Sequence, residues 1–591
     1  MPQGGRKVPF SAKQKKLQLQ HKRERKKGHD GVQPGNVETE RKKAPAENMS
    51  LGDVLRINVQ PGADGQARSS RVFRYALHFK RETAEELHRR KMRSREPFEV
   101  LPEEALETTP DEFFRPGSAL DMPQRPPWNR SMSKEALQAR EMQYFREYVE
   151  GIEKNFADSD LSYFELNLET WRQLWRVLEM SEVILLVADI RHPVLHFPPA
   201  LFTHVTKRLH KEVILVLNKI DLVPDQLTCA WMDFFQKQFP GLRVLPFASY
   251  AGMKVKGKKG KRQGKLKMAF EACKELISIC EELVGSKVDL SSWKRKIDEE
   301  FANGEMADDD DDDDEREGPE ADDLEVAPQD TGFYQEERYK DGVLTLGFVG
   351  HPNVGKSSLL NAIMGKKVVS VSRTPGHTKH FQTIFLTPKV RLCDCPGLVF
   401  PSLVPKPLQV LSGCFPVAQL REPYSAIQYM AERVPIPHIL KLHYPEDCKA
   451  WTAHHICEAW AIERGYLTAK AGRPDVYRAA NSILRMALDG RTLCLAFYPP
   501  GYTKDKGKFA NSPLLAKIAR IHCGRKPPSE EDSDRVSEKA SSSEEEDDDD
   551  ADDEEGHGIL PRRTLQGWSS HTWFCWFVLC IPLLAGLFGG F

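Results

Sequence analysis

The stretch Gly350-His-Pro-Asn-Val-Gly355-Lys356-Ser357 decides the fold of this chain. It follows an apolar run at 343–349 and precedes a predicted helix at 357–364, which gives a strand–loop–helix pattern. Glycines in such a loop let the backbone approach a phosphate without a Cβ clash. The helix after the loop offers free backbone N–H groups and the positive end of its dipole. The full G-x4-G-K-S spacing therefore predicts a phosphate-binding P-loop.

Two side chains of this loop have distinct predicted tasks. We expect Lys356 to reach the β- and γ-phosphates of a bound nucleotide and Ser357 to be a ligand of Mg2+. The residues of the loop that we expect to contact nucleotide are Gly350, His351, Pro352, Asn353, Val354, Gly355, Lys356, Ser357 and Ser358.

A second motif, Asn218-Lys-Ile-Asp221, lies upstream of the P-loop and ends the apolar run 213–217. A carboxylate there can accept hydrogen bonds from both N1–H and the exocyclic amine of guanine, whereas adenine offers neither set of donors. A site built on such bonds discriminates by roughly 10⁴ or more. We expect the Lys219 stem to pack on the base and Asn218 to tie this loop to the P-loop. The predicted guanine-binding residues are Asn218, Lys219, Ile220, Asp221 and, after the apolar run 244–247, Ser249.

Downstream of the P-loop, the sequence Asp394-Cys395-Pro396-Gly397-Leu398 ends another apolar run, 390–393. A carboxylate in this place can hold Mg2+, usually through water, and the Gly397 N–H can meet the γ-phosphate. All five residues join the predicted GTP-binding set. Between the P-loop and Asp394, either threonine of Thr374-Pro-Gly-His-Thr378 could reach Mg2+ and the γ-phosphate, although Thr374 could equally cap a turn.

Continuous apolar runs at 183–188, 213–217, 244–247 and 343–349 alternate with helical patterns, which is typical of a buried parallel sheet. The guanine motif precedes the P-loop, whereas an ordinary GTPase has the reverse order. We therefore predict an α/β fold: a circularly permuted P-loop G domain, with a mostly parallel sheet flanked by helices. A smaller, mainly helical C-terminal domain and disordered charged tails complete the predicted architecture.

The motif order resembles that of the circularly permuted GTPases of the YlqF/YawG type, which are linked to ribosome assembly. The resemblance covers about residues 165–400 and includes Asp189-Ile-Arg-His-Pro193, with Ile190 where alanine is usual, and the stretch 171–179. It implies Thr378 as the switch threonine. By this resemblance the catalytic residues are Lys356, Thr378 and Gly397, and the Mg2+ ligands are Ser357, Thr378 and Asp394.

The same resemblance bears on the rate of hydrolysis. Ras-type enzymes place a water-orienting glutamine directly after the glycine of the DxxG motif, where this chain has Leu398. Leucine cannot orient water, so slow intrinsic hydrolysis is expected. Asn353 stands where potassium-stimulated GTPases use asparagine as a K+ ligand; the alternative is that it only stabilises its loop. The implied cofactors are GTP, Mg2+ and K+.

The composition divides the 591 residues into segments of different character. We predict a basic disordered arm at 1–50, a weakly structured region at 51–130, the G domain at 131–404 with an acidic linker at 286–340 inside it, a helical domain at 405–525, an acidic disordered tail at 526–572 and an apolar terminus at 573–591.

Charged segments indicate the partners. The basic arm 1–28 and the basic loop 254–267 suit the phosphate backbone of ribosomal or other RNA and recognition by nuclear import receptors. Acidic runs such as 308–315 suit basic ribosomal proteins or cover the basic arms, and Ser541–Glu546 is typical of an acidic-directed phosphorylation site. Few aromatic residues interleave the arm, which argues against readout of a DNA sequence.

The twelve scattered cysteines show no CxxC pair, which indicates a reducing compartment. With the basic arm, this predicts a nuclear or nucleolar protein that shuttles to the cytoplasm. Residues 573–591 approach the length of a membrane span. They are either a tail anchor or, as Pro582 and the glycines favour, an alternative terminus without a selected function.

Two functions fit these features. The leading hypothesis is a slow GTP hydrolase that acts as a nucleotide switch in ribosome or ribonucleoprotein assembly. The alternative is a nucleotide-binding interaction protein, or scaffold, with negligible turnover.

Overall fold

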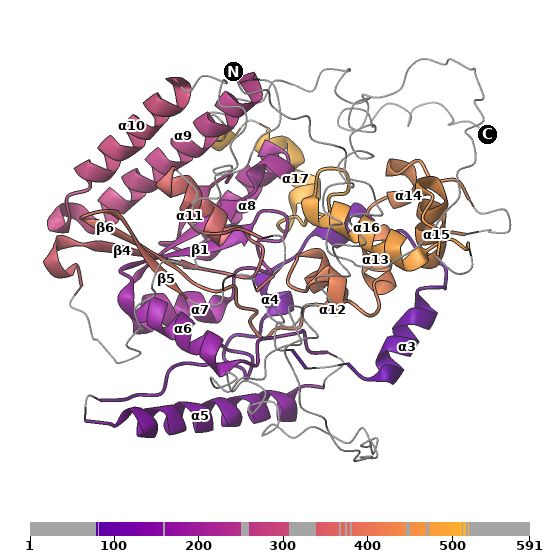
Figure 1. Cartoon of the computed structure of the whole chain (residues 1–591), viewed down its shortest axis with the longest axis horizontal. Helices are drawn as coiled ribbons and strands as arrows, with labels where there is room; N and C mark the ends of the chain where they lie inside the picture. Colours follow the sequence, from indigo (N-terminus) through magenta and orange to yellow (C-terminus); the bar gives the residue numbers. More distant parts are fainter. Residues whose placement is uncertain are drawn as a thin grey trace, which may run out of the picture. The chain divides into compact units, whose positions relative to one another are not determined.

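A six-stranded sheet in the order β3-β2-β1-β4-β6-β5 forms the centre of the computed structural model (Figure 1). The structure describes residues 79–80, 82–129, 131–157, 160–249, 259–306, 338–365, 368–372, 375–376, 378, 381–444, 450–468, 472–510, 512–515 and 518. The strands are β1 (Val183–Asp189), β2 (Glu212–Asn218), β3 (Arg243–Pro246), β4 (Leu344–Val349), β5 (Gln382–Thr387) and β6 (Val390–Asp394). The strand predictions are confirmed to within a residue or two.

The strands run parallel except β5, which pairs antiparallel with β6. All residues of β1 and β4 are buried, as continuous apolar runs require when both faces of a sheet are covered. The register places Asp189 beside Asn218 and Phe348 beside Asp394. Because parallel strands end at the same edge of a sheet, the three sequence motifs located after β2, β4 and β6 meet there.

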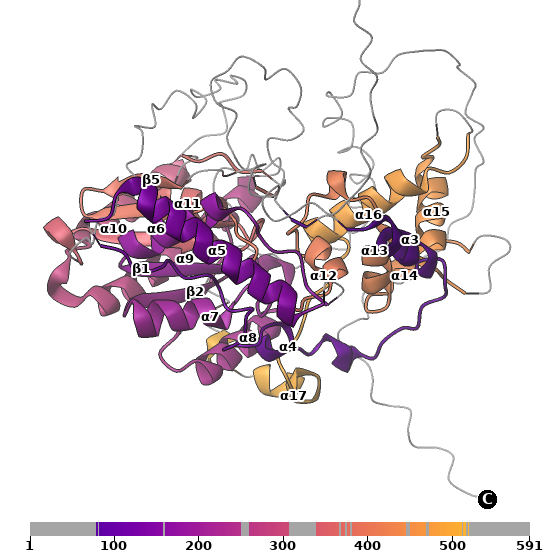
Figure 2. The same cartoon turned by 90° about the horizontal axis from the view of Figure 1, so that it is seen from below.

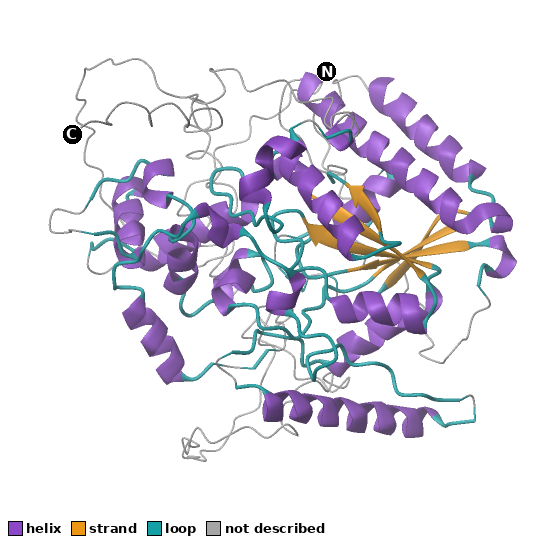
Figure 3. Cartoon of the chain, turned by 180° about the vertical axis from the view of Figure 1, so that it is seen from behind, coloured by secondary structure: helices purple, strands orange, loops and turns teal. Residues whose placement is uncertain are grey.

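Helices cover the sheet on both faces (Figures 1 and 3). They are α5 (Lys134–Asn155), α6 (Leu168–Met180), α7 (Pro199–Thr203), α8 (Asp225–Gln238), α9 (Lys259–Val284), α10 (Ser291–Met306) and α11 (Lys356–Met364). In Figure 1, α9, α10 and α11 lie above the sheet, and α6 and α7 lie below it. Trp171, Leu174, Trp175 and Leu178 give α6 its buried face at the predicted spacing.

The weakly structured region expected at 51–130 is wrong for its second half. Residues 82–129 contain α3 (Ala84–Arg93), the short 3-10 helix η2 (Glu103–Leu106) and α4 (Pro110–Phe113). Thr83 caps α3 through its side chain, and Phe113 and Phe114 are buried. The many prolines misled the prediction: Pro110 stands in the first turn of α4, where proline is tolerated. Residues 51–78 lie outside the described part.

The linker expected at 286–340 also begins as ordered structure. Its first part forms α10, which packs on α9 and β5 and buries the Trp293 side chain completely. The basic loop expected at 254–267 is helical from residue 259 onward, as the first turns of α9. The basic arm 1–50, residues 254–258, the acidic run 308–315, Ser541–Glu546, the tail 526–572 and the apolar terminus 573–591 lie outside the described residues.

The predicted helical C-terminal region is confirmed. It consists of α12 (Lys406–Leu411), the short helix η7 (Val417–Gln419), α13 (Tyr424–Ala431), α14 (Ile436–Ile439), α15 (Ala453–Arg464), α16 (Val476–Asp489) and α17 (Tyr502–Phe509) (Figure 2). Among the residues with described positions, no helix is both long and apolar enough to cross a membrane.

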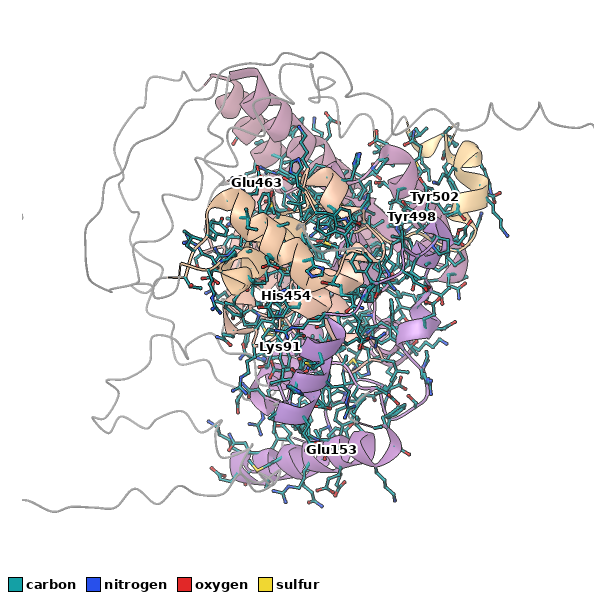
Figure 4. All side chains as sticks on the ribbon, turned by 90° about the vertical axis from the view of Figure 1, so that its right-hand side faces the viewer. Lys91, Glu153, His454, Glu463, Tyr498 and Tyr502 are labelled. Atoms are coloured by element: carbon teal, nitrogen blue, oxygen red, sulfur yellow. The ribbon has the colours of Figure 1, made fainter. Side chains whose placement is uncertain are left out.

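The chain returns from α16 to the G domain. Tyr498 pairs through its backbone with Leu106 and Thr108, and α17 packs on α8. The rings of Tyr498 and Tyr502, labelled in Figure 4, have centroids 5.0 Å apart. The Trp231 indole of α8 donates to the Phe497 carbonyl at 3.1 Å. The helical region is therefore anchored to the G domain at a second place, besides its covalent start after residue 404.

Two buried histidines follow β1. Asp189 donates its backbone N–H to His196 Nδ1 at 3.2 Å, and the His192 ring lies 5.6 Å from the Phe497 ring. Neither ring nitrogen of His192 has a hydrogen-bond partner among the described residues. Burial, with Arg191 as a further cause at His192, lowers the pKa of both His192 and His196 to about 3. Both rings are therefore neutral in the folded protein at physiological pH.

These histidines predict a loss of stability in mild acid. They take up protons only in the unfolded chain as pH falls below their ordinary pKa of about 6.5, so stability decreases from there toward pH 3. Lowering the pH from 7.5 to 5.5 should cost about 1.4 kcal/mol per histidine. His192→Phe should remove one such share from the pH dependence of urea unfolding, whereas the exposed His443→Phe should not. Parallel pH profiles for all three proteins would contradict this.

Candidate nucleotide-binding site

The P-loop wraps around the start of α11. Gly355 has φ +99°, and a Cβ there would lie 2.3 Å from Asn218 Nδ2, so only glycine fits. Lys356 Nζ donates to the carbonyls of Gly350 at 3.0 Å and His351 at 2.6 Å. Burial lowers the pKa of Lys356, although Asp394 opposes this. The ammonium group is thus held inside the loop that the sequence assigns to phosphate.

The predicted Mg2+ ligands lie together. Ser357 Oγ donates to Asp394 Oδ2 at 2.8 Å and is 3.4 Å from Thr378 Oγ1. Asp394 Oδ1 is buried and has no hydrogen-bond partner among the described residues. Burial raises the pKa of Asp394 to about 6, against the opposing charge of Lys356. Hydroxyl and carboxylate oxygens are the donors that Mg2+ prefers, so this set fits the ion. Thr374, the other candidate, lies outside the described residues.

The guanine motif is joined directly to the P-loop. Asn218 Nδ2 donates to the Val354 carbonyl at 2.8 Å, and Ser249 Oγ donates to Asn218 Oδ1 at 3.0 Å. Ser249 therefore supports Asn218, a role that the sequence did not suggest. Lys219 adopts a left-handed backbone conformation with φ +64°, and its Nζ donates to the Asn353 carbonyl at 2.8 Å. Base recognition and phosphate binding thus share one pocket.

The segment after β6 packs against the P-loop. Leu398 donates its N–H to the Gly350 carbonyl at 3.2 Å, and a Cβ at Gly397 would lie only 2.7 Å from Pro352 Cα. The Leu398 side chain is buried, as expected for a residue that does not orient water. Asn353 Nδ2 donates to the Gly413 carbonyl at 3.0 Å, so this side chain contacts the helical region.

Several predicted residues contribute to the pocket through backbone alone. His351 directs its ring into the core, 5.1 Å from the His196 ring and 5.7 Å from the Phe400 ring. The side chains of Pro352, Val354, Ile220, Cys395 and Pro396 are buried as well, whereas those of Asp221, Ser357 and Ser358 are partly exposed. Asp221, which should bind the base, is thus accessible to a ligand.

Sequence reasoning missed two residues of this site. Asp189 Oδ2 accepts from Lys219 Nζ at 2.8 Å and from Arg191 Nη2 at 2.8 Å. Burial opposes the charge of Asp189, but Arg191 and Lys219 outweigh it and hold the pKa of Asp189 well below its ordinary value. A signal for Asp189 was present, because it ends β1 as Asn218 and Asp394 end their strands. No motif pointed to its partners, however.

The comparisons with known proteins agree with this geometry. A family model described as "50S ribosome-binding GTPase" matches residues 345–425. The chain is 47% identical over 554 residues to human guanine nucleotide-binding protein-like 1, covering 89% of this chain and 91% of that protein. It is 31% identical over 469 residues to bovine "Large subunit GTPase 1 homolog", covering 67% of this chain and 69% of the relative.

Among solved structures, YlqF from T. maritima aligns over 98% of its own chain and 56% of this one, with 19% identity and a TM-score of 0.32. Identity to the human relative extends through nearly the whole chain, and the pocket has the parts that a GTPase needs. The chain therefore belongs to the family of circularly permuted GTPases that includes guanine nucleotide-binding protein-like 1.

Proposed function

We propose that this chain is a guanine-nucleotide switch that hydrolyses GTP slowly and acts in the assembly of ribosomal or other ribonucleoprotein particles. The hydrogen bond from Asn218 to the Val354 carbonyl carries the nucleotide part, since it joins the base-reading loop to the phosphate loop. In this arrangement Asp221 binds the guanine edge, Lys356 and the N–H groups at the start of α11 bind phosphate, and Gly397 meets the γ-phosphate.

Ser357, Asp394 and Thr378 would hold Mg2+, which when bound supplies positive charge to the phosphate oxygens. Burial of Leu398 supports a low intrinsic rate, because no side chain there can orient the attacking water. K+ held by Asn353 would then supply the missing positive charge. The bond from Asn353 to Gly413 supports the alternative that this residue stabilises its loop.

The role in assembly is supported by similarity. The matching family is described as ribosome-binding, and one relative is named for the large subunit. The basic segments 1–28 and 254–267 suit RNA phosphates and nuclear import receptors, and acidic runs such as 308–315 suit basic ribosomal proteins. A nuclear or nucleolar protein that shuttles and is phosphorylated near Ser541–Glu546 fits this role. Anchoring to a membrane through 573–591 is the minor alternative.

Asp221→Asn tests the base reader. An asparagine amide donates where the carboxylate accepted, so it opposes the exocyclic amine of guanine and matches the carbonyl that xanthine has there. We expect GTP affinity to fall by roughly 10² or more and XTP to bind better than GTP. Asp233→Asn on α8, which removes a carboxylate paired with Lys237, is the matched control. Full GTP preference in Asp221→Asn, measured by competition against a fluorescent nucleotide, would refute the assignment.

A combined assay tests the switch against the scaffold alternative. Single-turnover GTP hydrolysis should be slow in Na+ and at least about tenfold faster in K+, short of the roughly 10³–10⁵ of an arginine finger. The same protein should co-sediment with ribosomal particles more with a non-hydrolysable GTP analogue than with GDP. Equal sedimentation with both nucleotides would contradict a switch. No hydrolysis in either salt would favour the scaffold.

A further inference from the structure

Arg191, located just after β1, contacts two parts of the molecule at once. On the side of the pocket, Nε and Nη2 bind the two oxygens of Asp189 at 3.0 and 2.8 Å. On the other side, Nη1 donates to the Ala487 carbonyl at 2.9 Å and Nη2 to the Leu488 carbonyl at 3.2 Å. Those carbonyls end α16, where a helix presents unpaired acceptors and partial negative charge. One buried guanidinium therefore joins a strand of the G domain to a helix of the C-terminal region.

The pocket side of this contact leads directly to nucleotide-binding loops. Asp189 also accepts from Lys219 Nζ, and the same ammonium donates to the Asn353 carbonyl of the P-loop. Asn353 in turn donates through its side chain to the Gly413 carbonyl of the helical region. Each link is a hydrogen bond of 2.8 to 3.0 Å, so a shift of Arg191 changes the position of Lys219.

The helix side is equally close. Gly490 caps α16 with φ +73°, and a Cβ there would lie 2.6 Å from Arg191 Nη1 and 3.2 Å from Leu222 Cδ1. Leu222 is the residue directly after Asp221, the predicted base reader. Phe497 donates its backbone N–H to the Arg191 carbonyl at 2.8 Å. The guanidinium is 2% exposed and bonded on both sides, so it has no room to move away.

We propose that Arg191 is a positioning residue that couples the guanine-nucleotide pocket to the C-terminal end of α16. Bound nucleotide fixes Lys219 and Asp221, Arg191 transmits their position to the carbonyls of residues 487 and 488, and displacement of α16 acts back on the pocket. The coupling is reciprocal, as linkage requires. It rests on the proposed function only in that the chain binds guanine nucleotide. It adds a second connection to the covalent one that leads from Leu398 into the helical region.

Gly490→Ala tests the coupling from the helical side without altering a nucleotide-binding residue. Gly465→Ala is the matched control, because Gly465 caps α15 with φ +66° and a Cβ there meets nothing within 4 Å. Both variants place alanine in a left-handed cap, so both should lose similar thermal stability. Only Gly490→Ala displaces Arg191 and Leu222. We expect its affinity for a fluorescent GDP or GTP analogue to fall at least about fivefold, and that of Gly465→Ala to stay within about twofold.

Arg191→Lys gives a second test that does not depend on the glycine variant folding. Lysine keeps the charge but cannot bond Asp189 and both helix carbonyls with one planar fork. Hydrogen exchange of residues 487–490 should slow on nucleotide binding in the wild-type chain and in Gly465→Ala. It should respond less in Arg191→Lys. Equal nucleotide affinities in the two glycine variants, or an unchanged exchange response in Arg191→Lys, would overturn the coupling. Failure of the wild-type chain to bind guanine nucleotide would overturn both the coupling and the proposed function.

Discussion

The hydrogen bond from Asn218 to the Val354 carbonyl holds together two loops that the chain order keeps far apart. It is buried, and its amide is also oriented by Ser249. A buried amide left without partners costs about 1–3 kcal/mol, so this bond favours a single arrangement of the two loops. The base reader and the phosphate loop have fixed relative positions because of it. The specificity and the chemistry proposed for the pocket both depend on that geometry.

The parallel sheet explains why an inverted motif order still builds one pocket. The strands that precede the guanine motif, the P-loop and the DCPG segment all end at the same edge, with β1 and β6 on either side of β4. The order of the strands along the chain does not change where they end. It does decide that the helical region, rather than another strand, comes directly after the γ-phosphate segment. The return path of that region brings the end of α16 back to Arg191.

Apolar runs and motif spacing were enough to predict the sheet, its helices and the residues around phosphate, because those features depend on local sequence. The region 82–129 was not predictable in this way. Its helices are short, and its backbone pairs with Tyr498, far along the chain. The start of α10 looked like a polar linker because its described side chains bury only Trp293 and Ile297 among many charged neighbours.

Within the site, the same division between local and long-range contacts holds. The P-loop and the carboxylate at the end of β6 follow from spacing. Arg191 could not be assigned, because its partners on α16 are backbone carbonyls and carry no side-chain signature. The contact from Asn353 to Gly413 was hidden for the same reason. Ser249 was predicted to contact the base, but the structure shows it beside Asn218, a bond that a sequence pattern does not specify.

A crystal structure with a non-hydrolysable GTP analogue and Mg2+ tests the central claim most directly. A single pocket formed by the inverted motifs predicts that Asp221 binds N1–H and the exocyclic amine of guanine, while Lys356 contacts phosphate and the Ser357–Asp394 pair lies at the metal. Asn218 should keep its bond to the Val354 carbonyl. A nucleotide whose base lies away from Asp221, or whose metal is held without Ser357 and Asp394, would contradict the claim.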